Sequence, residues 1–273
     1  MRKKYTSMAL MALVLAGAVL LGSSSAQAQA SNATNAPSSD VVKDWHGSLS
    51  LGISLAKGNT DTLLAHLAGR AEKDWKQDEC SFGADYTYGL NNWGQSNQTK
   101  SASSLNGFAD YKRLFTDRFY GSLHIEGDHD DLAALRYRLI VGPNAGYYFI
   151  KSDASRLNLE VGPSYIRESL GDNPPIPPGH NETDSYITLR IAERGEHQLS
   201  KTSKIWEQVE YLPQVDKLSN YLLNSEAGAE ASLNAHLALR VVVDDKYNNK
   251  PAVGKKTNDI QLVASVVWKF GPE

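Results

Sequence analysis

Charged side chains of both signs recur along this chain in segments where apolar and polar residues alternate. They are Arg70, Glu72, Glu126, Arg136, Arg138, Glu160, Arg190, Glu210, Glu226, Glu230 and Arg240. If the fold gathers them in one interior, they can act in two ways. They can set the ion preference of a pore, or they can pair across a small interior and fill it. We favour the paired arrangement, with a narrow or closed path.

A second acidic group consists of Asp128, Asp130 and Asp131, which surround His129 in a segment expected to be a loop. Carboxylate oxygens are hard ligands that suit a divalent cation. The spacing, however, lacks the glycine and the final glutamate of an EF-hand loop. We therefore interpret the group as a solvated loop tip, and we predict no metal site and no cofactor.

The sequence carries no motif for covalent catalysis, because neither Gly-x-Ser-x-Gly nor His-Glu-x-x-His occurs in it. His66 and His124 fall at polar positions, where they can donate hydrogen bonds to acidic groups. We predict no catalytic residue and no enzyme activity. An enzyme that modifies lipids remains an alternative, which a Ser and His pair on adjacent strands near one membrane interface would favour.

The elements that must position these charges are β-strands, as the end of the chain illustrates. Leu262, Ala264, Val266, Trp268 and Phe270 share one face when side chains alternate with a period of two, and no helix would gather them. A final aromatic strand of this kind resembles the C-terminal signal of outer-membrane barrels, although Gly271, Pro272 and Glu273 follow it here.

The same alternation recurs in twelve segments. They span 45–55, 63–75, 80–91, 101–115, 119–126, 136–149, 157–165, 186–191, 204–212, 223–233, 237–244 and 260–270. Neither face of 204–212 is uniform, so its register is undecided. Val-Gly-Pro occurs at 141–143 and again at 161–163, and we expect bulges or a local bend at these two prolines.

Short connections alternate with longer ones, which are expected near 92–100, 127–134, 169–184, 213–220 and 247–258. This asymmetry is typical of a transmembrane β-barrel. Aromatic residues also gather towards the strand ends, at Trp45, Trp75, Trp93, Phe115, Phe119, Phe149, Trp268 and Phe270. The prediction is an all-β fold, a transmembrane antiparallel up-and-down β-barrel of twelve strands over residues 44–273. A soluble periplasmic barrel or sandwich that binds a small ligand is the alternative, because periodicity alone does not separate the two.

The N-terminal region has the pattern of a secretory signal peptide. Arg2, Lys3 and Lys4 precede an apolar run from Met8 to Leu21 and two Ala-x-Ala sites, so we expect a signal peptide over 1–30. Cleavage would follow Ala28 or Ala30. Residues 31–43 are rich in Ser, Asn and Ala without periodicity, which indicates a flexible leader. Together these features predict the outer membrane of a Gram-negative bacterium.

Charge and cysteine content narrow the partners. Without the three basic residues of the expected signal peptide, 25 basic side chains face 31 acidic ones, a formal charge of −6. An acidic surface argues against nucleic acid. Cys80 is the only cysteine, which excludes an intramolecular disulfide. The expected partners are outer-membrane lipid, the barrel-assembly machinery during biogenesis, and a small solute or ion.

Several short motifs resemble those of a known family. They are Trp45-His-Gly-Ser-Leu-Ser-Leu-Gly52, Lys57-Gly-Asn-Thr60, Gly142-Pro-Asn-Ala-Gly-Tyr147, Glu160-Val-Gly-Pro-Ser-Tyr165 and Gly195-Glu-His-Gln-Leu-Ser200. On these motifs the chain resembles the domain-of-unknown-function 481 family from about Trp45 to Phe270. That family includes a protein described as a salt-induced outer-membrane protein. The resemblance therefore implies an outer-membrane barrel with an envelope or stress role, and it implies no substrate or catalytic residue.

Overall fold

The computed structural model describes residues 45–56, 62–171, 182–252 and 254–271. The chain divides into two compact units, Met1–Val41 and Val42–Glu273, and every described residue belongs to the second. The expected signal peptide, the expected leader and the turn at 57–61 lie outside the described residues, as does most of the proline-rich connection at 172–181.

All described secondary structure is β. The strands are β1 (His46–Ala56), β2 (Thr62–Asp74), β3 (Asp78–Asn91), β4 (Thr99–Leu114), β5 (Phe119–Asp130), β6 (Leu135–Lys151), β7 (Ser155–Leu170), β8 (Thr183–Ser200), β9 (Ser203–Gln214), β10 (Lys217–Ser232), β11 (Leu237–Asn248) and β12 (Asn258–Phe270). Across these ranges, no helix is long and apolar enough to cross a membrane.

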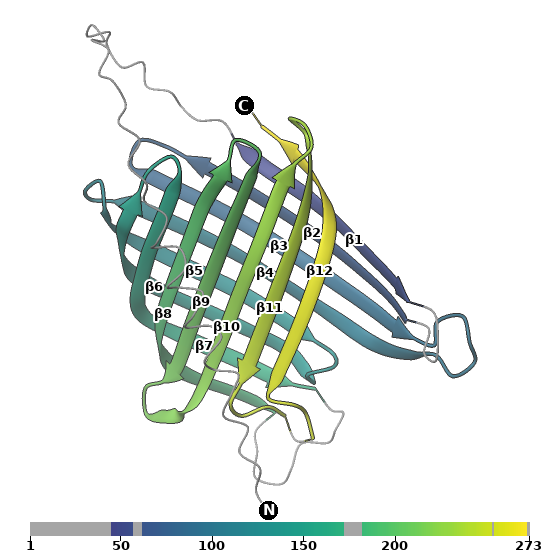
Figure 1. Cartoon of the computed structure of the whole chain (residues 1–273). Coiled ribbons are helices and arrows are strands. Elements are labelled where there is room, and N and C mark those ends of the chain that lie inside the picture. Colours follow the sequence, from purple (N-terminus) through teal and green to yellow (C-terminus); the bar gives the residue numbers. More distant parts are fainter. Residues whose placement is uncertain (1–44, 57–61, 172–181, 253, 272–273) are drawn as a thin grey trace, which may run out of the picture. The chain divides into compact units, whose positions relative to one another are not determined.

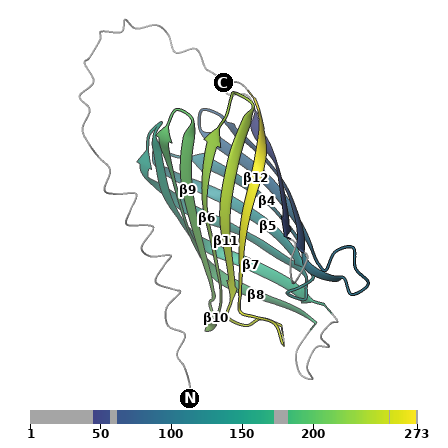
Figure 2. The same cartoon turned by 45° about the vertical axis from the view of Figure 1, so that its right-hand side comes forward.

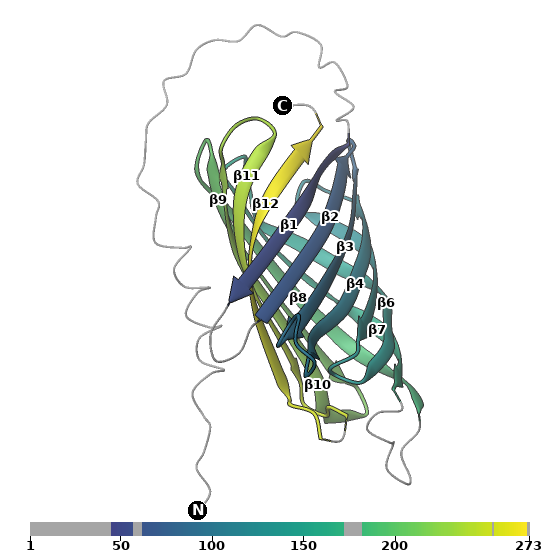
Figure 3. The same ribbon diagram turned by 90° about the vertical axis from the view of Figure 1, so that its right-hand side faces the viewer.

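The strands form one closed barrel in which each strand pairs antiparallel with its neighbours in the chain. The ring closes where β1 pairs with β12, from Gly47 opposite Phe270 to Leu51 opposite Val266. Figure 3 shows this seam, with the purple β1 beside the yellow β12. Strands on the near and far walls cross at a steep angle in Figures 1 and 2, because barrel strands tilt from the axis. The predicted twelve-stranded up-and-down barrel is confirmed.

The alternation along each strand separates an apolar outside from a polar inside. On β12, Leu262, Val266 and Trp268 are 65%, 51% and 54% exposed, whereas Val263 and Val267 between them are buried. The interior holds one buried apolar cluster, Ile140, Ile166, Leu212 and Leu222, and it also buries many polar groups. They are Ser50, Thr87, Ser103, Ser122, His124, Asn144, Asn158, Glu160, Ser164, Ser169, Thr188, Arg190, Glu210, Glu230 and Ser265. This distribution is the reverse of a soluble barrel, which buries its apolar face.

Aromatic side chains gather at one end of the barrel, on β12 and on β1 to β6. Trp45, Trp75, Phe115, Phe119, Phe149, Trp268 and Phe270 are all exposed, at the end where β1 begins and β12 ends. Neighbouring rings are in contact, with Trp45 6.5 Å from Trp75 and Phe115 5.8 Å from Phe119 between centroids. Trp93, also predicted at a strand end, is half-buried in the connection between β3 and β4.

The prediction of a long connection is wrong in two places. Strand β5 continues to Asp130, which leaves a turn at 131–134, and β9 continues to Gln214, which leaves only 215–216 before β10. Both strands were expected to end too early, because side chains that face a polar interior are themselves polar and so resemble loop residues in the sequence. Asp128 appears loop-like in the sequence, yet it pairs with Arg138 on β6 and its carboxylate accepts a hydrogen bond from Asn106 on β4.

The paired Gly-Pro sites lie opposite each other on β6 and β7. Pairing is interrupted between Val141–Tyr165 and Ala145–Val161, but the register is the same on both sides, so the expected bulge is absent there. The backbones approach closely instead. A Cβ atom on Gly162 would lie 2.1 Å from the Pro143 carbonyl oxygen.

The structure also decides the register of the ninth strand. Trp206, Glu210 and Leu212 point into the barrel, whereas Ile205, Glu207, Val209 and Tyr211 point outward. Glu207 and its neighbour Glu193 on β8 are therefore outward carboxylates near the aromatic end. These two residues interrupt the apolar outer surface.

This geometry predicts the cost of adding one methyl group at the Gly-Pro site. Gly162→Ala should destabilise the barrel by about 1–3 kcal/mol, because the new Cβ must displace the backbone of the neighbouring strand. Gly127→Ala is the matched control, since nothing lies within 4 Å of a Cβ there. Urea unfolding followed by tryptophan fluorescence measures both. Equal stability of the two variants would contradict the close approach.

Candidate functional site

The interior of the barrel, here called the lumen, holds the chain's main concentration of described buried charge. At its centre Arg190 on β8 bridges two carboxylates: Nε donates to Glu210 at 2.6 Å, and Nη1 donates to Glu160 at 2.8 Å. The three side chains are at most 6% exposed. Lys112 and Tyr120 also contact Glu160, at 2.9 and 3.0 Å. Buried charges are costly unless they are paired, and here each is paired.

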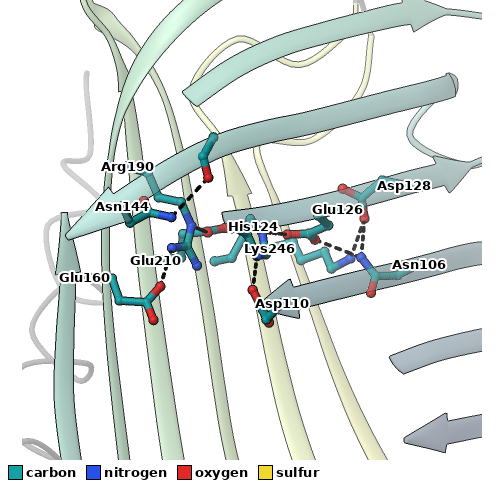
Figure 4. Close-up of polar contacts among 12 residues, drawn as sticks. Asn106, Asp110, His124, Glu126, Asp128, Asn144, Glu160, Arg190, Glu210 and Lys246 are labelled. Carbon is teal, nitrogen blue, oxygen red and sulfur yellow. Dashed lines mark hydrogen bonds and ion pairs between the residues drawn. The ribbon is translucent and has the colours of Figure 1, made fainter. Parts of the chain in front are cut away.

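A second group of contacts lies beside this bridge, as Figure 4 shows. His124 on β5 contacts Asp110 through Nδ1 at 2.7 Å and Glu126 through Nε2 at 3.3 Å. Asn106 donates to both Glu126 and Asp128, at 2.8 and 2.9 Å. Polar side chains from β4, β5, β8 and β9 thus meet in the middle of the lumen.

Two ion pairs cross the lumen between distant strands. Lys246 on β11 contacts Asp128 on β5 at 3.2 Å, and these two strands stand on opposite sides of the twelve-stranded ring. Arg70 on β2 contacts Glu226 on β10 at 3.3 Å. The Lys246 side chain nevertheless keeps 51% of its surface accessible, so open space surrounds it. The lumen is therefore narrowed by side chains without being filled completely.

The aromatic end of the lumen opens into a cavity of about 420 Å³. Its lining includes Glu72, Trp206, Glu230, Arg240 and Lys269. Glu230 contacts Arg240 and Lys269, each at 2.7 Å, so cations hold this carboxylate from two sides.

The structure places the predicted lumen charges at three levels. Glu126, Glu160, Arg190 and Glu210 meet at the centre, and Arg138 lies nearer the opposite end, where it pairs with Glu168 at 2.7 Å. Arg70, Glu72, Glu226, Glu230 and Arg240 lie towards the cavity. Arg136 is different, because its side chain is 44% exposed and pairs with Glu182 at the rim.

Several interior charges were missing from the sequence-based set. Lys246, Asp244 and Asp85 belong to the lumen, and Lys269 does as well. The alternation of side chains along a strand could have identified two of these charges. Asp244 and Lys246 share a face with Arg240 once β11 is extended to Asn248. The expected strand stopped too early to include Lys246.

The acidic group around His129 does not form a cation site. Asp128 points into the lumen, Asp130 accepts hydrogen bonds from the backbone of Leu132 and Ala133, and Asp131 contacts Lys100 at 2.6 Å. The three carboxylates are thus engaged in three separate places.

The histidines do not form a catalytic triad in the described part of the chain. His66 contacts Thr87 at 3.0 Å, and His124 contacts carboxylates without a serine nucleophile. Ser155 and His197 do form a pair on adjacent strands, 2.8 Å apart at the aromatic end. This is the kind of pair that would favour the alternative of a lipid-modifying enzyme. A complete catalytic triad also needs a third group that orients the histidine, and among the described residues no such contact to His197 is found.

The sequence model described as "Protein of unknown function, DUF481" matches residues 49–270, almost the whole barrel. The chain belongs to this family. This DUF481 protein has no match among curated protein sequences.

Among solved structures, the DUF481 barrel is similar to an outer membrane channel from Pseudomonas putida F1, with a TM-score of 0.47 and 9% identity over 87% of this chain and 100% of the other. It is also similar to the NanC porin, with a TM-score of 0.46 and 6% identity over 84% of this chain and 100% of the other. The translocator domain of the autotransporter NalP from Neisseria meningitidis gives a TM-score of 0.41 and 11% identity over 82% and 86%.

The buried bridge at the centre generates a stability prediction. Arg190→Ala leaves Glu160 and Glu210 without their shared cation, and breaking a buried pair in this way should cost about 3–5 kcal/mol of unfolding free energy. Arg136→Ala, at the rim, should change stability by less than about 0.5 kcal/mol. Guanidinium titration of the refolded chain compares them, and a bridge variant as stable as the rim variant would contradict the assigned role.

Proposed function

We propose that this DUF481 protein is an integral outer-membrane β-barrel of a Gram-negative bacterium that allows at most limited passage of small ions or solutes. The observation that carries the proposal is the reversed polarity of the barrel. Leu51, Leu67, Leu105, Leu139, Ile187, Leu239 and Val241 are 41–56% exposed on strands around the ring, while charges lie inside. Soluble proteins rarely expose continuous apolar surfaces of this extent, and hydrocarbon is the solvent that suits them.

The ends of the barrel support the same placement. The end with Trp45, Trp268 and Phe270 carries the short turns, as the periplasmic end of such barrels does. Exposed Tyr86, Tyr137 and Tyr165 lie towards the other end. The strands have 11–18 residues, and about 9–11 are enough to cross a bilayer, so the longer strands project beyond the apolar zone. The expected signal peptide agrees with export.

The lumen favours restricted passage over a wide pore. A twelve-stranded barrel is intermediate in width, and here Lys246–Asp128 and Arg70–Glu226 cross the path. Carboxylates outnumber cations among the inward-facing charges between the cavity and Arg138. The acids are Glu72, Asp85, Asp110, Glu126, Asp128, Glu160, Glu168, Glu196, Glu210, Glu226, Glu230 and Asp244, and the cations are Arg70, Lys112, Arg138, Arg190, Arg194, Lys204, Arg240, Lys246 and Lys269. Any current should therefore be carried mainly by cations.

If the barrel is inserted in a membrane, a charge added to its outer face should destabilise it more than a charge added to its lumen face. Leu51→Arg, in the middle of β1 on the outer face, should cost about 2–4 kcal/mol of folding stability in lipid. Glu72→Arg, at the wet mouth of the lumen, should be much milder. Refolding into liposomes followed by urea titration measures both, and a water-soluble, fully folded Leu51→Arg protein would argue against insertion.

Restricted passage predicts small currents that grow when the lumen crossing is removed. In planar bilayers the refolded chain should give small, cation-preferring steps, and Lys246→Ala should enlarge them because it removes both the crossing side chain and a positive charge. Lys100→Ala, at an exposed pair, is the control. A folded but silent wild type and variant would favour a purely structural envelope role and reject passage. Large anion-preferring steps would contradict the lumen as described.

A further inference from the structure

The centre of the lumen contains three potential metal ligands that the ion pairs of the barrel do not fully explain. His124 and Glu126 on β5 and Glu210 on β9 each offer one potential ligand atom, and these atoms lie within 4.8 Å of one another. Three strands separate β5 from β9 in the ring, so the site joins two walls of the barrel. His124 and Glu210 are only 6% and 4% exposed in their side chains.

The imidazole of His124 is oriented as in a metal site. Its Nδ1 lies 2.7 Å from Asp110, so Nδ1–H donates to that carboxylate, and Nε2 lies 3.3 Å from Glu126. A carboxylate behind the ligating histidine fixes the tautomer and raises the basicity of the coordinating nitrogen. A ring nitrogen that faces a carboxylate in this way needs a positive charge between the two, either a proton or a metal ion.

The charge of the connected network favours a divalent ion. Five carboxylates, Asp110, Glu126, Asp128, Glu160 and Glu210, are joined by contacts to three cations, Lys112, Arg190 and Lys246. With neutral His124 the network carries two excess negative charges. One divalent cation neutralises it in a partly desolvated place where excess charge is costly.

The surroundings leave capacity for further coordination. Arg190 and Asn224 each contact one oxygen of Glu210, but a carboxylate offers about four lone-pair directions and can hold a metal as well. On the lumen face next to His124, Ser122 Oγ and Asn144 Oδ1 are buried without a protein partner. Water can satisfy buried polar atoms of this kind, and water can also complete the coordination of an ion held by three protein ligands.

We propose that His124, Glu126 and Glu210 bind one divalent first-row transition ion, such as Zn²⁺, inside the lumen, with Asp110 as the positioning residue behind His124. One nitrogen and two oxygen donors suit such ions, whereas Mg²⁺ and Ca²⁺ prefer sites of oxygen alone. Metal binding at this site requires neither insertion of the chain in a membrane nor a current through the lumen. A failure of this proposal is therefore distinguishable from a failure of the proposed function.

Isothermal titration of the refolded full barrel with ZnCl₂, after treatment with a chelator, tests the site. The expected result is one Zn²⁺ per chain, with binding lost in His124→Ala and Glu210→Gln. Asp110→Asn, which removes only the charge behind the histidine, should weaken binding by about 10–100-fold. His66→Ala is the matched control, because His66 also faces the lumen but contacts Thr87 rather than a carboxylate pair, and it should bind as the wild type does.

Heat-modifiable migration in gels verifies that each variant is folded. A measurement on the wild type alone guards against variants that fail to fold: X-ray absorption of the Zn²⁺-loaded barrel should show a nitrogen ligand at about 2.0–2.1 Å together with oxygens. Three results would overturn the site: equal Zn²⁺ uptake by the wild type and His124→Ala, a coordination shell of oxygen atoms alone, or no Zn²⁺ uptake by the folded wild type. The positive charge beside Nε2 of His124 would then be a proton.

Discussion

The whole structure depends on the closure of one antiparallel ladder between β1 and β12. Once Gly47–Leu51 pairs with Val266–Phe270, every strand has two neighbours and no edge remains open. Closure divides the side chains into two populations, because alternate residues point to opposite faces of a sheet. The outer face is apolar and the inner face is charged, so the outer face suits hydrocarbon and the inner face suits water. An open sheet of the same sequence would expose backbone groups that hydrocarbon cannot satisfy.

The charged interior is stable because its members hold one another in place. Arg190 lies between Glu160 and Glu210, and Glu230 lies between Arg240 and Lys269. The same arrangement narrows the path, since the side chains that neutralise one another also occupy the lumen. Structural integrity and the proposed restricted passage are therefore consequences of one network. The excess of carboxylates within it also favours the cation that we propose at the centre.

Much of the fold could be predicted from the period of two alone. The outward set on β12 and the inward placement of Arg190 and Glu230 follow from it directly. Strand ends were harder, because a polar residue that faces a polar lumen resembles a loop residue, and Asp128 is the clearest example. The register of β9 required its neighbours, since pairing with β8 and β10 determines which face of a mixed strand is inside. The meeting of His124 with Glu210 was beyond sequence reasoning, because the curvature of the ring brings β5 and β9 together.

The central claim is that a lipid-facing surface and a wet lumen alternate along each strand of a closed barrel. Spin labels at Val241 and Val242, neighbouring residues on opposite faces of β11, test it most directly after Cys80→Ser removes the native cysteine. Power saturation of the chain refolded in liposomes should show oxygen access at position 241 and access of a water-soluble nickel complex at position 242. Access of the nickel complex to both labels would contradict insertion, and oxygen access at both would contradict the wet lumen.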